Sequence, residues 1–294
     1  MLGLEISDSL VTAVAVDDDG RVVARETTDA KAGVGEAALE ALDEVADRGS
    51  AAAPGAAGLA AANPESPAAA AALAVIAPRY APPKDGIIAS GTAAALAEAW
   101  VGAARAARDV VFFGVADHAV AGIVRNGAPF FGAHRRATSI AWLALNPVER
   151  EDYRKMGCLE AEVAAAGIVR RLIWRIKAGD RSRVADAVSG DFTAITVDLI
   201  FDAARQGDGV SISVMRDTAK YLGMAAANLV VMADPDTLVL GGIMASAGDL
   251  LMDPVRIELV RRLPRAMADA LTIVPAMLGA DAAAIGAARF SARQ

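Results

Sequence analysis

The amino-acid sequence predicts an α/β protein whose two related halves face one another across a cleft. A meander of short strands followed by helices opens the chain, and a second set of strands followed by helices begins after residue 109. The length of 294 residues and the hydrophobic fraction of 55% are sufficient for two cores of ordinary size. Because paired α/β units commonly hold a ligand between them, we expect a small-molecule ligand in the cleft.

The first half is predicted to be an antiparallel meander followed by helices. Two apolar runs flank the polar group Ser7-Asp8-Ser9, and Gly20 closes the turn before a third strand. Apolar residues at helical spacing predict the first surface helix. The predicted elements are strands within Leu2–Val16 and Arg21–Thr28, a helix at Gly35–Arg48, a strand at Gly58–Ala61 and a helix within the Ala- and Pro-rich segment Ser50–Pro83.

A short strand at Gly86–Ala89 closes this half and is predicted to end at Ser90. Thr92 is predicted to cap the helix Ala93–Arg105, since a threonine hydroxyl can accept a hydrogen bond from the first free amides of a helix. A side chain at the end of that strand would be well placed for catalysis.

The second half is predicted to repeat the alternation of strands and helices. Its first two strands are followed by Asn126-Gly127, a strong signal for a hairpin turn. The predicted elements are strands at Val110–Val115 and Ala119–Arg125, helices over Glu149–Arg181 and Ile212–Ala233, a strand at Leu238–Leu240, a strand at Leu271–Pro275 and a last helix at Ala282–Phe290. We therefore expect a smaller domain of residues 1–106, completed by 282–294, and a larger domain of residues 107–281.

Composition excludes several classes of function. The net charge of −7 and the lack of a long Lys/Arg stripe give no support for binding to nucleic acid or to an anionic membrane. The longest apolar runs, such as Ala68–Ala77, are too short to cross a bilayer. The first strand begins almost at Met1, so we expect no export signal and a cytoplasmic location. The single cysteine, Cys158, cannot form an internal disulfide.

Several motifs follow one another at consistent spacing from residue 86 onward. They are Thr92–Val124 with Asn126-Gly127, Gly132-Ala133-His134, Gly157-Cys158-Leu159-Glu160, Tyr221-Leu222-Gly223 with Asn228-Leu229-Val230, Leu240-Gly241-Gly242, Leu278-Gly279-Ala280-Asp281-Ala282 and Gly286-Ala287-Ala288. Together they resemble the ROK family of bacterial repressors, open reading frames and sugar kinases. The resemblance implies a two-domain, actin-like ATPase fold of the ribonuclease H type, a sugar in the cleft and a homodimer.

The resemblance also assigns two turns to nucleotide phosphates, and the chain departs from both. The family's Asp-x-Gly-Gly-Thr turn is matched by Glu5–Ser9, which keeps an acid and loses both glycines. The family's Gly-Thr-Gly-x-Gly turn is matched by Ala116–Gly122, which keeps only the last glycine. Without those glycines the backbone amides approach phosphate less easily. The nucleotide-binding residues that the resemblance leaves are Ser9, Gly122, Gly241 and Gly242.

The catalytic base of the family is an Asp at the end of a strand, and Ser90 occupies its place. A serine hydroxyl does not accept a proton from a sugar hydroxyl at neutral pH, so Ser90 cannot replace this base. Asp8, Asp117 and His118 are the candidates for a relocated base if the protein is an active kinase. Asp117-His118 is alternatively an ordinary polar turn between two strands.

The sugar and zinc motifs are altered as well. The family's Gly-Glu-x-Gly-His element is replaced by Thr138–Trp142, and its zinc-binding cysteines are reduced to Cys158, so we predict no zinc. The resemblance leaves Glu160, Ser139 and His134 as substrate-binding residues. Glu160 equally fits the acidic first turn of a helix.

A second interpretation of His134 includes its two basic neighbours. His134, Arg135 and Arg136 either hold an anionic ligand such as a sugar phosphate or form a solvated loop.

Three functions remain open for such a chain. The first is a catalytically degenerate sugar-kinase-like protein, a pseudokinase, that binds a small molecule such as a sugar, or a partner protein. The alternative is an active hexose or amino-sugar kinase of the glucokinase type that uses ATP and Mg²⁺. The third is a ROK-type transcriptional regulator that lacks its DNA-binding domain.

Overall fold

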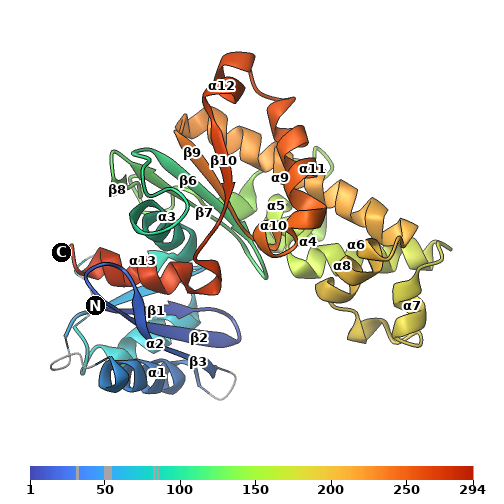
Figure 1. Cartoon of the computed structure of the whole chain (residues 1–294). Helices are drawn as coiled ribbons and strands as arrows, with labels where there is room; N and C mark the ends of the chain where they lie inside the picture. Colours follow the sequence, from blue (N-terminus) through green and yellow to red (C-terminus); the bar gives the residue numbers. More distant parts are fainter. Residues whose placement is uncertain (31–32, 50–54, 82–83, 85, 294) are drawn as a thin grey trace.

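Two five-stranded sheets organise the computed structural model, which describes residues 1–30, 33–49, 55–81, 84 and 86–293 (Figure 1). The strand order is β3-β2-β1-β4-β5 in the first sheet and β10-β9-β6-β7-β8 in the second. In each sheet an antiparallel meander of three strands is extended by two parallel strands. The second half therefore repeats the topology of the first, as the sequence predicts.

The first sheet confirms the predicted meander. It contains β1 (Leu2–Ile6), β2 (Leu10–Val16), β3 (Val22–Asp29), β4 (Ala57–Ala61) and β5 (Ile88–Ala89). Helices α1 (Val34–Arg48) and α2 (Pro67–Ile76) pack together beside this sheet. The predicted segment Ser50–Pro83 includes 50–54 and 82–83, which lie outside the described residues.

Helix α3 (Ser90–Trp100) begins earlier than the sequence predicts. Strand β5 passes directly into this helix, so Ala89 holds the capping position and makes no side-chain cap. The prediction that Thr92 caps the helix is wrong, because Thr92 lies inside the first turn and is buried. The helix also ends five residues before the predicted Arg105.

The second sheet contains β6 (Val110–Val115), β7 (Ala119–Arg125), β8 (Ala128–Pro129), β9 (Thr237–Gly242) and β10 (Thr272–Pro275). Asn126 and Gly127 connect β7 to β8 with φ angles of 51° and 74°. Both angles are positive, which is the conformation of a tight type I′ hairpin. This turn is confirmed.

The predicted helix Glu149–Arg181 is divided into three. It consists of α4 (Glu151–Met156), α5 (Cys158–Val163) and α6 (Ala165–Lys177). The chain is interrupted at Gly157, whose φ is 92°, and at Ala164, which is extended. Neither backbone conformation continues a helix.

The long predicted helix is α9 (Gly209–Ala233), which begins three residues before Ile212 because the Asp208 side chain caps it. The remaining helices of this half are α7 (Arg183–Ala187), α8 (Val197–Arg205), α10 (Ile243–Ser246), α11 (Gly248–Val260), α12 (Arg265–Ala270) and the short 3₁₀ turns η1 (Ile140–Trp142), η2 (Phe192–Ala194) and η3 (Gly279–Asp281). Of the helices in the described ranges, none is long and apolar enough to cross a membrane.

Helices α3 and α13 (Ala282–Ser291) lie side by side between the two sheets (Figure 1). A Cβ atom on Gly286 of α13 would lie 1.8 Å from the carbonyl oxygen of Ala93 in α3. A Cβ atom on Gly91 would lie 2.2 Å from the carbonyl oxygen of Ala121 in β7. Glycine at these positions lets the elements approach closely, which fixes how the two sheets face one another.

Candidate functional site

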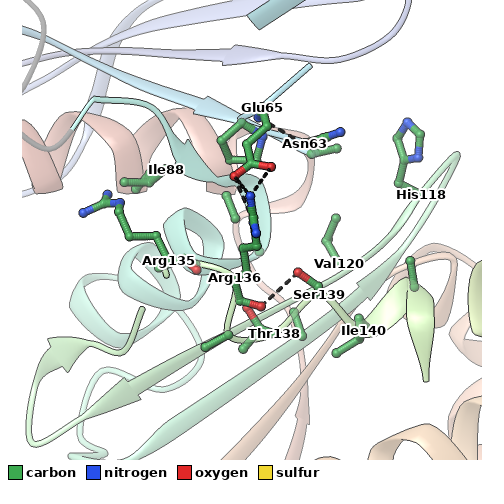
Figure 2. A pocket seen from close by; sticks show the side chains of 18 of the residues that line it. Asn63, Glu65, Ile88, His118, Val120, Arg135, Arg136, Thr138, Ser139 and Ile140 are labelled. Carbon is green, nitrogen blue, oxygen red and sulfur yellow. Dashed lines mark hydrogen bonds and ion pairs between the residues drawn. The ribbon is translucent and has the colours of Figure 1, made fainter. Parts of the chain in front are cut away.

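A cavity of about 950 Å³ opens between the two sheets. The first half contributes the segment after β4, including Asn63 and Glu65, and the junction of β5 with α3. The second half contributes β7 and the loop of residues 131–142 (Figure 2). Glu160 of α5 also lines the cavity. A cavity of this size accommodates a small organic ligand.

His118 joins the two halves at one side of this cavity. Its Nε2 atom lies 3.0 Å from Oδ2 of Asp8 in the β1–β2 turn, and its Nδ1 atom lies 3.3 Å from Oε1 of Glu160. The other carboxylate oxygen of Glu160 accepts a hydrogen bond of 3.0 Å from the backbone amide of Ala119. The Glu160 carboxylate, helped by Asp8, raises the pKa of His118 to about 9. The imidazole is therefore a cation at neutral pH and holds its proton too tightly to act as a base.

A second ion pair crosses the cavity. The Nε and Nη2 atoms of Arg136 donate hydrogen bonds of 2.9 and 2.8 Å to Oε1 of Glu65, and Nη2 lies 3.0 Å from Oε2 (Figure 2). Both side chains are more than half exposed. Solvent weakens such a pair, so its main effect is to position the loop that carries Arg136.

Ser90 lies between two cavity-lining residues, Ala89 and Gly91, and is itself buried. Its hydroxyl has no hydrogen-bond partner among the described residues. The hydroxyl does lie close enough to the Glu5 carboxylate to favour its ionised form, but burial outweighs this effect and raises the pKa of Glu5. A carboxyl group thus remains next to the position where the family's catalytic Asp is expected.

The loop of residues 131–142 carries most of the other predicted ligand contacts. His134, Ser139 and Glu160 all line the cavity. The Ser139 hydroxyl donates to the backbone oxygen of Arg136 at 2.9 Å (Figure 2). Arg135 lies 4.3 Å from the centre of the Phe131 ring.

The predicted nucleotide-binding residues are not among the residues that line the cavity. Gly122 contacts the backbone of Gly91, where an added Cβ would come within 2.1 Å of a carbonyl oxygen. Gly242 has a φ of 61° and packs against the carbonyl of Val115. Gly241 lies against the ring of Phe112, and the backbone oxygen of Ser9 accepts a hydrogen bond of 2.9 Å from the amide of Ala30. A role of these four residues in nucleotide binding stays a prediction. Asp117 is exposed in its turn.

The residues that replace the zinc motif do not fit a zinc ion. Cys158 is buried among apolar atoms with Tyr153 and Ala161. No group of three or more His, Cys, Asp or Glu side chains suited to a metal occurs in the described part of the chain. Instead, buried Glu162 accepts from Tyr153 and pairs with Arg150 at 2.9 Å and Arg171 at 2.5 Å.

Sequence reasoning did not identify Asn63, Glu65 and Thr138 as residues of the site. Asn63-Pro64 after a strand is a loop signal that could have placed the first two near the strand end. Thr138 has a φ of 72° and a buried hydroxyl without a partner among the described residues. Nothing in the local sequence indicates either property.

Two sheets of matching topology with a ligand-sized cavity between them give the chain an actin-like fold of the ROK sugar-kinase type. The family model described as "ROK family" matches residues 88–294. The chain belongs to the ROK family.

Named relatives include both enzymes and regulators. The chain is 33% identical over 196 residues to a glucokinase of Halalkalibacterium halodurans, which covers 66% of this chain and 59% of that enzyme. It is 29% identical over 162 residues to the DNA-binding transcriptional dual regulator NagC of Escherichia coli, covering 55% of this chain and 38% of the regulator. The matches thus span about three fifths or less of these relatives.

The solved structure of a ROK glucokinase from Streptomyces griseus, in complex with glucose and AMPPNP, superposes with a TM-score of 0.80. The match covers 100% of this chain and 99% of that one at 21% identity, which shows the shared fold. The presence of glucokinases among the named relatives supports the kinase alternative better than the interpretation of a protein without catalysis.

Proposed function

We propose that the cavity between the two sheets binds a hexose or a hexose derivative. The observation that carries the proposal is the position of this cavity, which is lined from both halves and contains His134, Ser139 and Glu160. The names of its relatives support the same ligand class, because they include glucokinases and an N-acetylglucosamine repressor.

We propose further that phosphoryl transfer by the family route is weak. Ser90 has no carboxylate to take the proton of the sugar hydroxyl. His118 is protonated at neutral pH, so it does not act as a base. Its pairing with Asp8 also occupies the space between the turns Glu5–Ser9 and Ala116–Gly122, which the resemblance assigns to phosphate. Removing a general base lowers the rate by roughly 10²- to 10⁴-fold, and the altered turns add to that loss.

An active ATP-dependent hexose kinase is the second candidate. The relatives named glucokinases favour it, and Glu5 supplies the specific observation. A carboxyl group whose pKa is raised by burial is better suited to accept a proton near neutral pH than an ordinary one. Glu5 beside Ser90 would be the relocated base in this case. Mg²⁺ and ATP belong to this candidate, because a bound metal ion neutralises the phosphate charge in such a transfer.

One assay separates the two candidates. Glucose, mannose, N-acetylglucosamine and N-acetylmannosamine are each offered with ATP and Mg²⁺, and ADP formation is followed by a coupled reaction. Turnover of roughly 1–100 s⁻¹ would establish the kinase, and its loss in Glu5→Gln would identify the base. Turnover at least a hundredfold lower, together with a higher melting temperature in the presence of one sugar, supports the binding protein.

Two further expectations belong to the same proposal. Membership of the family implies a homodimer, which sedimentation analysis would test. A regulatory role without DNA binding is the third candidate, and a gel-shift experiment with genomic fragments tests whether this chain binds DNA by itself.

A further inference from the structure

We propose that a groove in the second half of the molecule is a second ligand site and that it binds an aromatic monocarboxylate. The groove has a volume of about 450 Å³ and is lined by helices α5, α6 and α9 and by the loop that precedes α4. Three features carry the inference, namely an exposed aromatic ring, an excess of positive charge and hydrogen-bond donors that are still available.

The groove is distinct from the cavity between the two sheets. Among the described residues, none lines both. The short helix α5 contributes to each of them, since Glu160 lines the cavity and Glu162 lines the groove. The inference therefore goes beyond the proposed function and does not depend on a sugar in the cavity.

Trp174 supplies an aromatic surface that the protein leaves open. The residue is 49% exposed. The guanidinium carbons of Arg150 and Arg170 lie 4.8 and 5.1 Å from the centre of its ring, and this cation–π attraction holds the indole in place. A ring that is already fixed loses little conformational freedom when a ligand stacks on it. Trp174 is therefore well suited to bind a flat ring.

The charged side chains of the groove leave one positive charge in excess. Three cations line it, Arg150, Arg171 and Lys220, together with the carboxylates of Glu162 and Asp217. Glu162 lies 2.9 Å from Arg150 and 2.5 Å from Arg171, so one carboxylate serves two guanidinium groups. Asp217 pairs with Lys220 at 2.9 Å. A single anionic group on a ligand would balance the lining.

Asp152, which lies outside the lining, does not remove this excess. It lies 2.7 Å from Arg150 and 2.9 Å from Arg170, so it too is shared by two guanidinium groups. The side chains of Asp152 and Glu162 are largely buried. Because the whole cluster lies partly out of water, an unbalanced charge in it attracts an anion more strongly than it would at an open surface.

Hydrogen-bond donors remain available for that anion. Arg150 donates only through Nη1 and Nη2, and its Nε–H has no acceptor in the part of the chain that the structure describes. Lys220 is about half exposed and donates one hydrogen bond, to Asp217, whereas an ammonium group carries three hydrogens. A carboxylate has two oxygens and can accept from several such donors at once.

These features together define the class of ligand. A flat ring matches the exposed indole of Trp174 and the side chains of Leu145 and Met224, which also line the groove. One carboxylate matches the single excess charge, whereas a cation would increase it. A groove of this volume holds a small organic compound.

Calorimetric titration of the intact chain with 2-naphthoate tests the inference, because this compound combines flat fused rings with one carboxylate. Two analogues separate its features. The amide 2-naphthamide keeps the rings and lacks the charge, and decalin-2-carboxylate keeps the charge and lacks the flat rings. We expect each analogue to bind about tenfold more weakly than 2-naphthoate.

Trp174→Ala is expected to weaken the binding of 2-naphthoate about tenfold, because the stacking surface is lost. Trp142→Ala is the matched control, since Trp142 is also exposed, at 58%, but lines the cavity between the sheets. Its affinity for 2-naphthoate should equal that of the wild type. A loss of affinity in Trp142→Ala, with none in Trp174→Ala, would place the compound in the cavity and overturn the inference.

Two substitutions at the edge of the groove test its charge. Asp217→Asn releases Lys220 from its pair and should tighten the binding of 2-naphthoate roughly two- to fivefold, whereas Lys220→Gln should weaken it by a similar factor. Asp202→Asn is the control, because Asp202 pairs with Arg205 at the same spacing along a helix and lies outside the groove. It should leave the affinity unchanged.

Three results would overturn the second site. The first is a wild type that does not bind 2-naphthoate with a Kd of about 1 mM or tighter. The second is equal affinity for 2-naphthoate and 2-naphthamide, and the third is equal affinity in the wild type and Trp174→Ala. Each would leave the proposed function standing, since sugar binding is measured separately.

Discussion

The imidazole of His118 and the carboxylate of Asp8 are 3.0 Å apart, although 110 residues separate them in the chain. Each belongs to a turn for which the sequence resemblance predicts contact with nucleotide phosphates, and the pair joins those two turns directly. The carboxylate of Glu160 lies 3.3 Å from the other ring nitrogen of His118, Nδ1. A nucleotide phosphate entering between the turns would have to separate His118 from Asp8.

The contribution of His118 to stability is expected to depend on pH. Its pKa is raised from 6.5 to about 9 in the folded state, so the stabilisation is complete below pH 6.5 and is lost as the pH rises through about 9. We expect the stability difference between the wild type and His118→Gln to fall by about 1–2 kcal/mol over this range, a value reduced for solvent exposure of the ring. Urea unfolding of both proteins at pH 6 and pH 10 measures it. A difference that grows with pH would contradict the assignment.

A side chain at Gly91 is expected to lower the stability of the fold. An added Cβ would lie 2.2 Å from the carbonyl oxygen of Ala121, and backbone cannot move aside as a flexible side chain can. Gly91→Ala should therefore lower the free energy of unfolding by about 1–3 kcal/mol. Gly209→Ala is the control, because an added Cβ at Gly209 meets nothing within 4 Å. Equal melting temperatures for Gly91→Ala and Gly209→Ala would show that α3 and β7 can move apart without a loss of stability.

Glu98 is expected to be among the most sensitive positions for stability. Its fully buried carboxylate accepts hydrogen bonds from the backbone amides of Ala103 at 2.7 Å, Met277 at 2.9 Å and Leu278 at 3.0 Å. Glu98→Ala leaves three amides without their acceptor and should cost roughly 3 kcal/mol or more.

Glu98→Gln tests whether the three backbone amides need a side chain that only accepts hydrogen bonds. The amide oxygen of Gln can still accept, but its NH₂ group would meet at least one backbone donor. We therefore expect an intermediate loss of stability in chemical unfolding, between wild type and Glu98→Ala. If Glu98→Ala and Glu98→Gln were both as stable as the wild type, water would be replacing the carboxylate as the acceptor.

Treatment with a metal chelator is expected to leave the melting temperature of the protein unchanged. Near Cys158, the residue that the resemblance matches to the zinc ligands, Glu162 pairs with Arg150 and Arg171, and Cys158 itself packs among apolar atoms. Dialysis against EDTA followed by thermal unfolding measures the effect. Glu162→Ala provides the positive control, because it leaves two partly buried guanidinium groups without their carboxylate and should cost roughly 3–5 kcal/mol. A fall in melting temperature on chelation alone would indicate a bound metal.

The sequence predicts the two halves well because their apolar patterns and turn residues are local signals. Strands β6 and β7 and the Asn126-Gly127 turn are found at their predicted positions. The prediction of a Thr92 cap is wrong because it rests on the local preference for threonine, whereas β5 runs into α3 without a loop. The domain boundaries near residues 106 and 281 remain a prediction.

The candidate site was predictable only in part. His134, Ser139 and Glu160 come from recognisable motifs and do line the cavity. The pairing of Asp8 with His118, and of Glu65 with Arg136, depends on how two distant segments meet, which no local pattern encodes. The strain at Thr138 likewise follows from the path of the surrounding loop.

The position of α13 determines which of the two sheets can be completed first during synthesis. This helix is made near the end of synthesis, yet it covers β1 and β4, which are among the first strands to emerge. The second sheet can assemble from a continuous stretch of nascent chain, whereas the first sheet keeps one apolar face uncovered until residues 282–291 exist. During that interval the earliest part of the chain is the part most exposed to chaperones and to aggregation.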